Sequence, residues 1–261
     1  MNGISFGFGA VEGELWRLLF AMTRIGAALL AAPLFGAASV PVQLRVAISG
    51  AIAVLVCAWT PLAIPPALLS PGGLLILAGE VAIGLSIGFV LQLSFAAPTI
   101  AAELIGGAMG MSIATTVDPN SGATSPALGQ YFTVVLTLIF LGLGAHLQWI
   151  ALLVRSFDTF PPGSTWFTPD RMSAIAGFGG AMFATAIAIA LPVTLVLLLV
   201  QLLTGVLSRS APSLNLFSLG LPAGVLAGLA ALIVAMPLIT DQLVTLSATA
   251  IGQAAMVAGA R

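Results

Sequence analysis

Long apolar runs separated by short polar segments make up most of the 261-residue chain. A helix that crosses a bilayer needs about 20 apolar residues, and these runs are of that order. No stretch alternates apolar and polar residues as the strands of a membrane barrel do. The pattern predicts an all-α, hydrophobic, membrane-associated protein that forms one helical domain, residues 1–261. Its apolar segments are expected at approximately 15–35, 46–69, 74–97, 99–117, 128–154, 172–207 and 221–257.

The apolar stretch from Leu74 to Val117 is too long for one crossing. As one helix it would measure about 66 Å, whereas the hydrocarbon core of a bilayer is about 30 Å thick. Pro98 is the expected place for a bend, and two spans or one buried hairpin both stay open. The segment SPGG, Ser70 to Gly73, is typical of a turn before this stretch. Further prolines predict other broken helices, at positions 33, 41, 61, 65, 66, 192, 222 and 237.

The composition agrees with a membrane environment. Apolar residues make up 60% of the chain and charged residues only 6%, whereas about a quarter of a soluble domain is charged. The net charge is −1, and all seven basic residues are arginines, so no basic surface for nucleic acid is expected. Glu12 and Glu14 precede the first arginine, Arg17, which is the reverse of a secretory signal, so the N-terminus is expected to stay in the mature protein.

Residues for catalysis or cofactor binding are scarce. Cys57, His146 and Tyr131 are each the only residue of their type, and neither a paired-histidine metal motif nor a phosphate-binding loop occurs. We therefore expect no enzyme activity, no metal and no cofactor.

Four charges lie inside or beside apolar segments and need a partner: Arg24, Glu80, Glu103 and Asp241. They are typical either of an ion or proton relay or of buried ion pairs. Ion pairs are favoured because the acids are spread over separate segments. Arg17 and Arg24 are seven residues apart and hence on one helix face, so we expect them to pair with Glu80 or Glu103.

Glycines spaced by four residues predict close contacts between helices. General packing and specific subunit contacts both remain open for them. The pairs and triplets are Gly84 with Gly88, Gly106 with Gly110, and Gly220 with Gly224 and Gly228.

Several short motifs occur in an order and spacing that resembles the FliR/SctT family of type III export gate subunits. They are RIGAALLAAPLFGAASVPVQLR from Arg24, GEVAIGLSIG from Gly79, GAMGMSIATTVDPNSGATSPALGQ from Gly107, GAHLQWIALLVRS from Gly144, and RSAPSLNLFSLGLP from Arg209. Within the last motif the residues that carry the likeness are Arg209, Pro212, Asn215 and Phe217.

The resemblance implies a core subunit of the flagellar protein export gate, located in the bacterial inner membrane at the flagellar basal body. It implies bent helical hairpins that assemble with FliP and FliQ, joined by FlhB and FlhA, into a channel for unfolded flagellar proteins. The injectisome export apparatus is the alternative within the family. A small secondary transporter, with Glu80, Glu103 and Asp241 as ion sites, is the alternative from another class.

The resemblance also implies that residues 107–122 form a plug that helps to seal the channel. Methionine suits a seal because its side chain is flexible and repacks easily. The chain departs from the family at 113–116, where Ile113, Thr115 and Thr116 replace phenylalanines, and at Ala223, which replaces a basic residue. The gating residues expected from the resemblance are Met109, Gly110, Met111, Ile113, Asp118 and Pro119.

Overall fold

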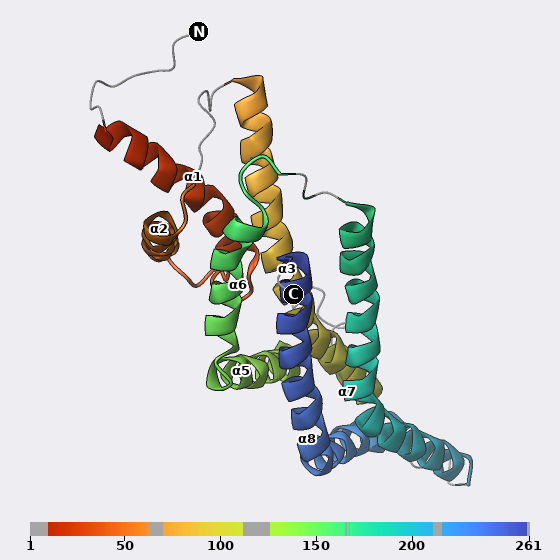
Figure 1. Cartoon of the computed structure of the whole chain (residues 1–261). Coiled ribbons are helices and arrows are strands. Elements are labelled where there is room, and N and C mark those ends of the chain that lie inside the picture. Colours follow the sequence, from red (N-terminus) through yellow and green to blue (C-terminus); the bar gives the residue numbers. More distant parts are fainter. Residues whose placement is uncertain are drawn as a thin grey trace. The chain divides into compact units, whose positions relative to one another are not determined.

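The structure is a computed structural model that describes residues 10–62, 70–111, 126–164, 166, 168–210 and 216–259. Every regular element in these ranges is a helix, which confirms the predicted all-α class (Figure 1). The helices are α1 (Ala10–Ala31), α2 (Val42–Trp59), α3 (Pro71–Ala108), α5 (Pro126–Gly142), α6 (Ala145–Thr159), α7 (Pro169–Ser210) and α8 (Leu216–Val257).

The chain divides into two compact units. Unit 1 comprises Met1–Leu93, Gly144–Phe178 and Thr249–Arg261, and unit 2 comprises Ser94–Leu143 and Gly179–Ala248. Helices α3, α7 and α8 each contribute to both units. The single domain expected from the sequence stays a prediction.

Local chemistry explains where α2 ends and where α3 begins. Helix α2 ends at Trp59 because the residue before a proline disfavours helical geometry and Pro61 follows Thr60. The rest of the apolar segment that was expected to reach residue 69 lies largely outside the described residues. The expected turn at Ser70–Gly73 is instead the start of α3. Ser70 Oγ accepts a hydrogen bond from the Gly73 backbone N–H (3.1 Å), and Pro71 occupies the first helical position.

Prolines do not end the long helices. The segments expected at 74–97 and 99–117 form one helix of 38 residues with Pro98 inside it, and the helix ends at Ala108. Pro192 lies inside α7, and Pro222 and Pro237 lie inside α8. A proline removes one backbone hydrogen bond, which neighbouring groups replace readily enough for prolines to occur inside membrane helices.

A glycine breaks a segment that was expected to be continuous. The segment expected at 128–154 is divided into α5 and α6, and Gly144 between them has a φ of 66°. This left-handed conformation favours glycine because it has no Cβ. The chain therefore leaves helical geometry at Gly144, where apolarity alone predicted a continuous run.

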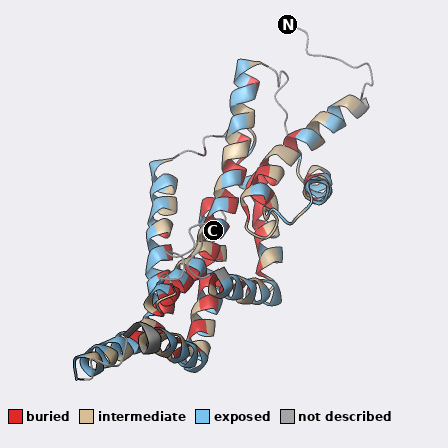
Figure 2. Ribbon diagram, turned by 180° about the vertical axis from the view of Figure 1, so that it is seen from behind, coloured by how far each residue is buried: buried red, intermediate tan, exposed pale blue. Residues whose placement is uncertain are grey.

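The core of unit 1 forms where α1, α3 and α6 each turn one apolar stripe inward (Figure 2). The buried residues lie on one side of each helix and recur every four positions in α3 and α6, as an inward-facing helix requires. Trp149 of α6 is fully buried and donates its Nε1–H to the backbone oxygen of Ile87 in α3 (3.4 Å). The stripes consist of Phe20, Ile25, Ala28 and Leu29 in α1; Ile83, Ile87 and Leu91 in α3; and Trp149, Leu153 and Phe157 in α6.

The core of unit 2 follows the same rule. Phe95 of α3 and Phe140 of α5 meet edge to face, with ring centroids 5.7 Å apart. The buried side chains repeat at helical spacing in each element: Phe132, Leu136 and Phe140 in α5; Met182, Ala186, Ile189, Val193 and Leu197 in α7; and Ile239, Leu243 and Leu246 in α8.

Candidate functional site

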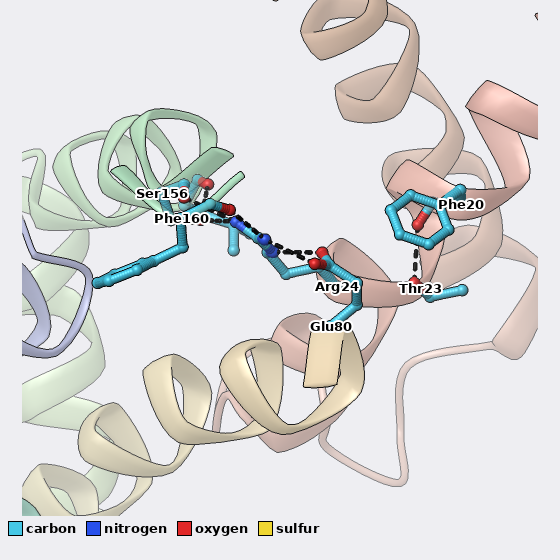
Figure 3. Close-up of polar contacts among 7 residues, drawn as sticks. Phe20, Thr23, Arg24, Glu80, Ser156 and Phe160 are labelled. Carbon is cyan, nitrogen blue, oxygen red and sulfur yellow. Dashed lines mark hydrogen bonds and ion pairs between the residues drawn. The ribbon is translucent and has the colours of Figure 1, made fainter. Parts of the chain in front are cut away.

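A buried ion pair joins α1 to α3 within unit 1 (Figure 3). Arg24 Nε donates to Glu80 Oε2 (2.7 Å), and Arg24 Nη2 donates to Glu80 Oε1 (2.9 Å). Arg24 is 0% exposed and Glu80 is 1% exposed. The fork of the guanidinium thus matches both carboxylate oxygens, which is the strongest geometry for such a pair.

Arg24 also binds the C-terminal end of α6. Its Nη1 donates to the Ser156 backbone oxygen (2.7 Å) and to Ser156 Oγ (3.1 Å), and its Nη2 donates to the Phe160 backbone oxygen (2.7 Å). With the two bonds to Glu80, all five guanidinium N–H groups have an acceptor. A positive charge at a helix C-terminus is also favoured by the helix dipole.

The ring of Phe157 completes the surroundings of this guanidinium. Arg24 Cζ lies 4.1 Å from the centroid of the Phe157 ring, within the range of a cation–π contact. We call Arg24, Glu80, Ser156, Phe157 and Phe160 the arginine site. Because it ties together α1, α3 and the end of α6, the arginine site orients three helices of unit 1.

Two glycines allow α3 to approach α1 beside the arginine site. Gly84 and Gly88 follow Glu80 at intervals of four residues, so all three lie on one face of α3. A Cβ at Gly84 would collide with the backbone oxygen of Arg24, and a Cβ at Gly88 would collide with that of Ala28. The face that presents Glu80 to Arg24 is therefore also the face that needs glycine.

Phe160 connects the arginine site with the C-terminal end of α8. Its ring lies beneath Arg171, whose Cζ is 4.4 Å from the ring centroid, and it also crowds Gly259, where the backbone φ is 71°. Trp166 donates its Nε1–H to the Val257 backbone oxygen (3.3 Å), and Arg171 donates to the Trp166 backbone oxygen (2.9 Å). The loop after α6 thus holds residues 257–259 inside unit 1.

The methionine segment begins where α3 ends, in unit 2. Gly110 has a φ of 81° and donates its N–H to the Gly107 oxygen (3.0 Å), while Met111 N–H donates to the Gly106 oxygen (3.0 Å). These two bonds form a Schellman motif, in which a left-handed glycine ends the helix. The sequence GGAMGM at 106–111 therefore contains the residues that end helix α3.

Met109 lies against two glycines of α8. It is 4% exposed, and a Cβ at Gly228 would collide with its side chain. A Cβ at Gly224 would lie 3.1 Å from the Met109 backbone oxygen. Gln201 of α7 donates its Nε2–H to the Ala108 backbone oxygen (2.7 Å). Elements α7 and α8 together hold the last turn of α3.

Other predicted residues lie apart from these contacts. Arg17 pairs with Glu14 of its own helix (2.9 Å), so the expected pairing with Glu80 or Glu103 is wrong for Arg17. Glu103 is exposed, as is Asp241. Gly106 is buried and Gly220 is half-buried, whereas Arg209 is exposed in the last turn of α7.

Part of the expected plug and of the last motif lies outside the described residues. Ile113, Asp118, Pro119, Pro212 and Asn215 belong to this group. Phe217 lies in the first turn of α8, and its side chain is also outside the described part of the structure. Their expected roles stay predictions.

Sequence reasoning missed Phe160, Gln201 and the role of Ser156. Phe160 acts through its backbone oxygen at the end of α6, and Gln201 caps a helix that ends 93 residues earlier. The signal for Gln201 was its position as an amide inside an otherwise apolar run. Nothing local distinguishes Phe160 from other core aromatics.

The fold and these sites define a helical membrane protein organised around a buried ion pair. Four helices are long and apolar enough to span a membrane: Val42–Trp59, Pro71–Ala108, Pro169–Ser210 and Pro222–Val257. A fifth span arises if the broken pair Ala127–Gly142 and Ala145–Thr159 is counted as one. No group of three potential metal ligands occurs within the described ranges.

Comparison with known proteins identifies the family. The family described as bacterial export proteins, family 1, matches residues 15–250. The chain therefore belongs to this family. It is 33% identical over 216 residues to the flagellar biosynthetic protein FliR of Pectobacterium carotovorum subsp. carotovorum, a match that covers 83% of this chain and 82% of that protein.

Two further relatives bear the same name. FliR of Escherichia coli (strain K12) is 33% identical over 224 residues, covering 86% of this chain and 84% of that protein. FliR of Bacillus subtilis (strain 168) is 33% identical over 225 residues, covering 85% and 86% respectively. The similarity thus extends over most of the chain and spans distant bacteria.

Proposed function

We propose that the protein is a core, non-enzymatic subunit of the flagellar type III protein export gate, where it forms part of the channel wall and plug. The observation that carries the proposal is the family match over residues 15–250, together with relatives that are flagellar biosynthetic proteins. The location that fits this role is the bacterial inner membrane at the flagellar basal body.

Helix dimensions support assembly with other subunits. Helix α3 has 38 residues, and α7 and α8 have 42 each, so they measure about 57–63 Å at 1.5 Å per residue. A hydrocarbon core about 30 Å thick covers only half of that length. Large apolar side chains are exposed along α7, from Phe183 to Leu207. Other protein subunits are the natural cover for the apolar helix surface that the bilayer leaves uncovered.

The partners proposed are subunits of the FliP and FliQ type, with FlhB and FlhA, and the cargo is unfolded flagellar protein. The test is co-expression with FliP and FliQ, followed by mass measurement of the purified complex. We expect one complex that contains all three proteins. A monodisperse chain that ignores both partners would contradict the proposal.

The segment that starts at Met109 is proposed as the seal. Met109 and Met111 leave the end of α3 through the Schellman motif, so the following residues start from an anchored point. Replacement of residues 113–116 by glycine is expected to increase ion leakage through the assembled gate. Unchanged leakage would show that this segment is not the seal.

Two alternatives are weaker on specific grounds. For a secondary transporter, Glu80 would have to bind an ion, but both of its carboxylate oxygens accept hydrogen bonds from Arg24. For an injectisome subunit, the relatives named above would be expected to belong to that system, and they are flagellar proteins. A deletion strain that loses motility while any injectisome still secretes would support the flagellar role over the injectisome role.

A further inference from the structure

The last turn of α3 has more carbonyl groups than its own backbone can satisfy. A helix leaves its last four carbonyl oxygens without a partner in the regular pattern. The Schellman motif supplies backbone N–H donors to the oxygens of Gly106 and Gly107. The next oxygen along the chain, that of Ala108, accepts from Gln201 Nε2 of α7 (2.7 Å). The end of α3 therefore uses a donor that lies 93 residues further along the chain.

Gln201 is a polar residue in an apolar part of α7. An amide or carbonyl among apolar groups costs free energy unless it has a hydrogen-bond partner. The amide of Gln201 and the carbonyl of Ala108 each supply the partner that apolar side chains lack. The leucines that flank Gln201 in the sequence are 51–64% exposed: Leu198, Leu199, Leu202 and Leu203.

Met109, the residue after Ala108, is held separately by α8. Its side chain fills the space that a Cβ at Gly228 would need, because that Cβ would lie 2.6 Å from Met109 Cγ. Gly224, one turn earlier in α8, leaves room for the Met109 backbone oxygen. A flexible methionine side chain can repack, whereas a hydrogen bond has a defined direction. The contact with α8 thus fixes the position of Met109 less strictly than a hydrogen bond would.

The hydrogen bond from Gln201 is not needed to end α3. The left-handed geometry of Gly110 and the two backbone bonds of the Schellman motif end the helix without α7. The bond from Gln201 instead fixes the direction of the Ala108 oxygen. Because a peptide unit is planar, this also fixes the orientation of the Met109 N–H. Gln201 therefore sets the orientation of the peptide unit from which Met109 starts.

We propose that Gln201 is a positioning residue of the seal. By holding the peptide unit between Ala108 and Met109, its side chain keeps Met109 in the space left by Gly224 and Gly228, and so keeps the idle gate closed to ions. The proposal rests on the gate function proposed above, and it adds a residue of a different helix to the seal. Leakage through the gate should then depend on a single hydrogen-bond donor in α7.

Gln201→Met tests the proposal with little change in shape. Methionine has a side chain of similar length but no N–H group to donate. Thr204→Val is the matched control, because Thr204 lies three residues further along α7 and its Oγ1 donates to the Gln201 backbone oxygen (2.9 Å). The control removes a side-chain hydrogen bond from the same helix and leaves the contact with α3 intact.

The first measurement is hydrogen exchange of the Met109, Gly110 and Met111 amides in the complex purified with the partner subunits proposed above. Gln201→Met is expected to speed this exchange about fivefold, the factor that corresponds to one net hydrogen bond. Thr204→Val is expected to exchange at the native rate. Unchanged exchange in Gln201→Met would overturn the proposal, because the bond would then hold nothing in place.

The second measurement is ion leakage, followed as loss of membrane potential in a deletion strain that carries each variant. Leakage is divided by the amount of assembled complex, so that poor assembly does not count as a tight seal. Gln201→Met is expected to raise leakage several-fold, as is the replacement of residues 113–116 by glycine, whereas Thr204→Val stays at the native level. A purely structural cap would change the exchange rate alone. Native leakage in Gln201→Met, beside a leaking glycine variant, therefore overturns the proposal.

Failure of the proposed function gives a different pattern. If neither Gln201→Met nor the glycine replacement raises leakage, this segment is not the seal, and the positioning role of Gln201 is overturned with it. If the native chain does not co-purify with the proposed partner subunits, the gate function itself fails. The two kinds of failure are therefore distinguishable.

Discussion

A single guanidinium, that of Arg24, links three helices of unit 1 while it is fully withdrawn from solvent. Its five N–H groups all have acceptors, but only one of the accepting residues, Glu80, carries a negative charge. An unpaired charge at such a place is costly because the surroundings cannot solvate it. The acid Glu80 is therefore the residue on which the stability of the arginine site depends most directly.

Glu80→Gln is expected to destabilise the protein strongly. The change leaves Arg24 buried without a counter-charge, and such a loss costs about 3–5 kcal/mol. Glu14→Gln is the matched control, because the Glu14 side chain is 66% exposed in its pair with Arg17 and exposed pairs contribute about 0–1 kcal/mol. The measurement is the free energy of unfolding in detergent. Equal effects of the two changes would contradict this account of Arg24.

Exchange of Arg24 and Glu80 is expected not to restore stability. A carboxylate at position 24 cannot donate hydrogen bonds to the backbone oxygens of Ser156 and Phe160, which now accept from Arg24. Rescue by the exchanged pair would show that these two bonds matter little. The sequence limits the acid partner of Arg24 to Glu80 or Glu103 but does not predict the two backbone acceptors, because backbone oxygens have no residue-type signal.

Gly110→Ala is expected to destabilise the end of α3 by about 1–2 kcal/mol, the usual cost of left-handed geometry for a residue with a Cβ. Gly107→Ala, three residues earlier, is the control. Its Cβ would meet nothing within 4 Å, and alanine favours a helix by about 1 kcal/mol over glycine. Hydrogen exchange of the Met111 amide and thermal unfolding both report the difference. A harmless Gly110→Ala would exclude the Schellman stop.

At the scale of elements, the contact between α1 and α3 depends on glycines whose function the spacing suggested. Gly84→Ala and Gly88→Ala are each expected to force the helices apart, with a cost of about 1–3 kcal/mol or more, because backbone atoms of α1 block the new methyl group. Gly79→Ala on the same helix meets nothing within 4 Å and is expected to be neutral or stabilising. Thermal unfolding of the three variants checks the order, and a Gly79 effect as large as the others would refute it.

Met109 and Gly228 are expected to be energetically coupled. Met109→Ala leaves a cavity and costs about 2–5 kcal/mol, and Gly228→Ala alone crowds the methionine side chain. In the double variant the new methyl group partly fills the cavity, so its effect should be smaller than the sum of the two. A double-mutant cycle measures this coupling, and strict additivity would show that the two residues do not share space.

Element boundaries show what a pattern of apolar residues leaves open. The long run after Ser70 forms one helix, α3, that continues through Pro98, and the bend expected there stays a prediction. The run at 128–154 was expected to be continuous and is broken at Gly144. Hydropathy measures preference for an apolar environment, and it carries little information on backbone conformation within such a run.

At the scale of the whole molecule, the apolar helices exceed what a bilayer covers, and this links stability to assembly. We expect the chain expressed alone to be polydisperse in detergent and the chain co-expressed with FliP and FliQ to be monodisperse.

In a motility assay of a deletion strain, the native chain and Glu14→Gln are expected to restore swimming. Glu80→Gln is expected to restore it poorly because less subunit accumulates. Full motility with Glu80→Gln would show that the arginine site is not required for function.

The sequence by itself determined that this protein is helical, belongs in a membrane, and carries a charge pair and close-packed glycines in the first half of the chain. These properties follow from composition and from spacing along single helices, which are local quantities. Only the tertiary structure decided that Arg24 binds the end of α6, that Arg17 pairs within its own helix, and that Met109 lies on Gly228. Such contacts depend on which helix faces meet, and distant segments of similar apolarity give no signal for that choice.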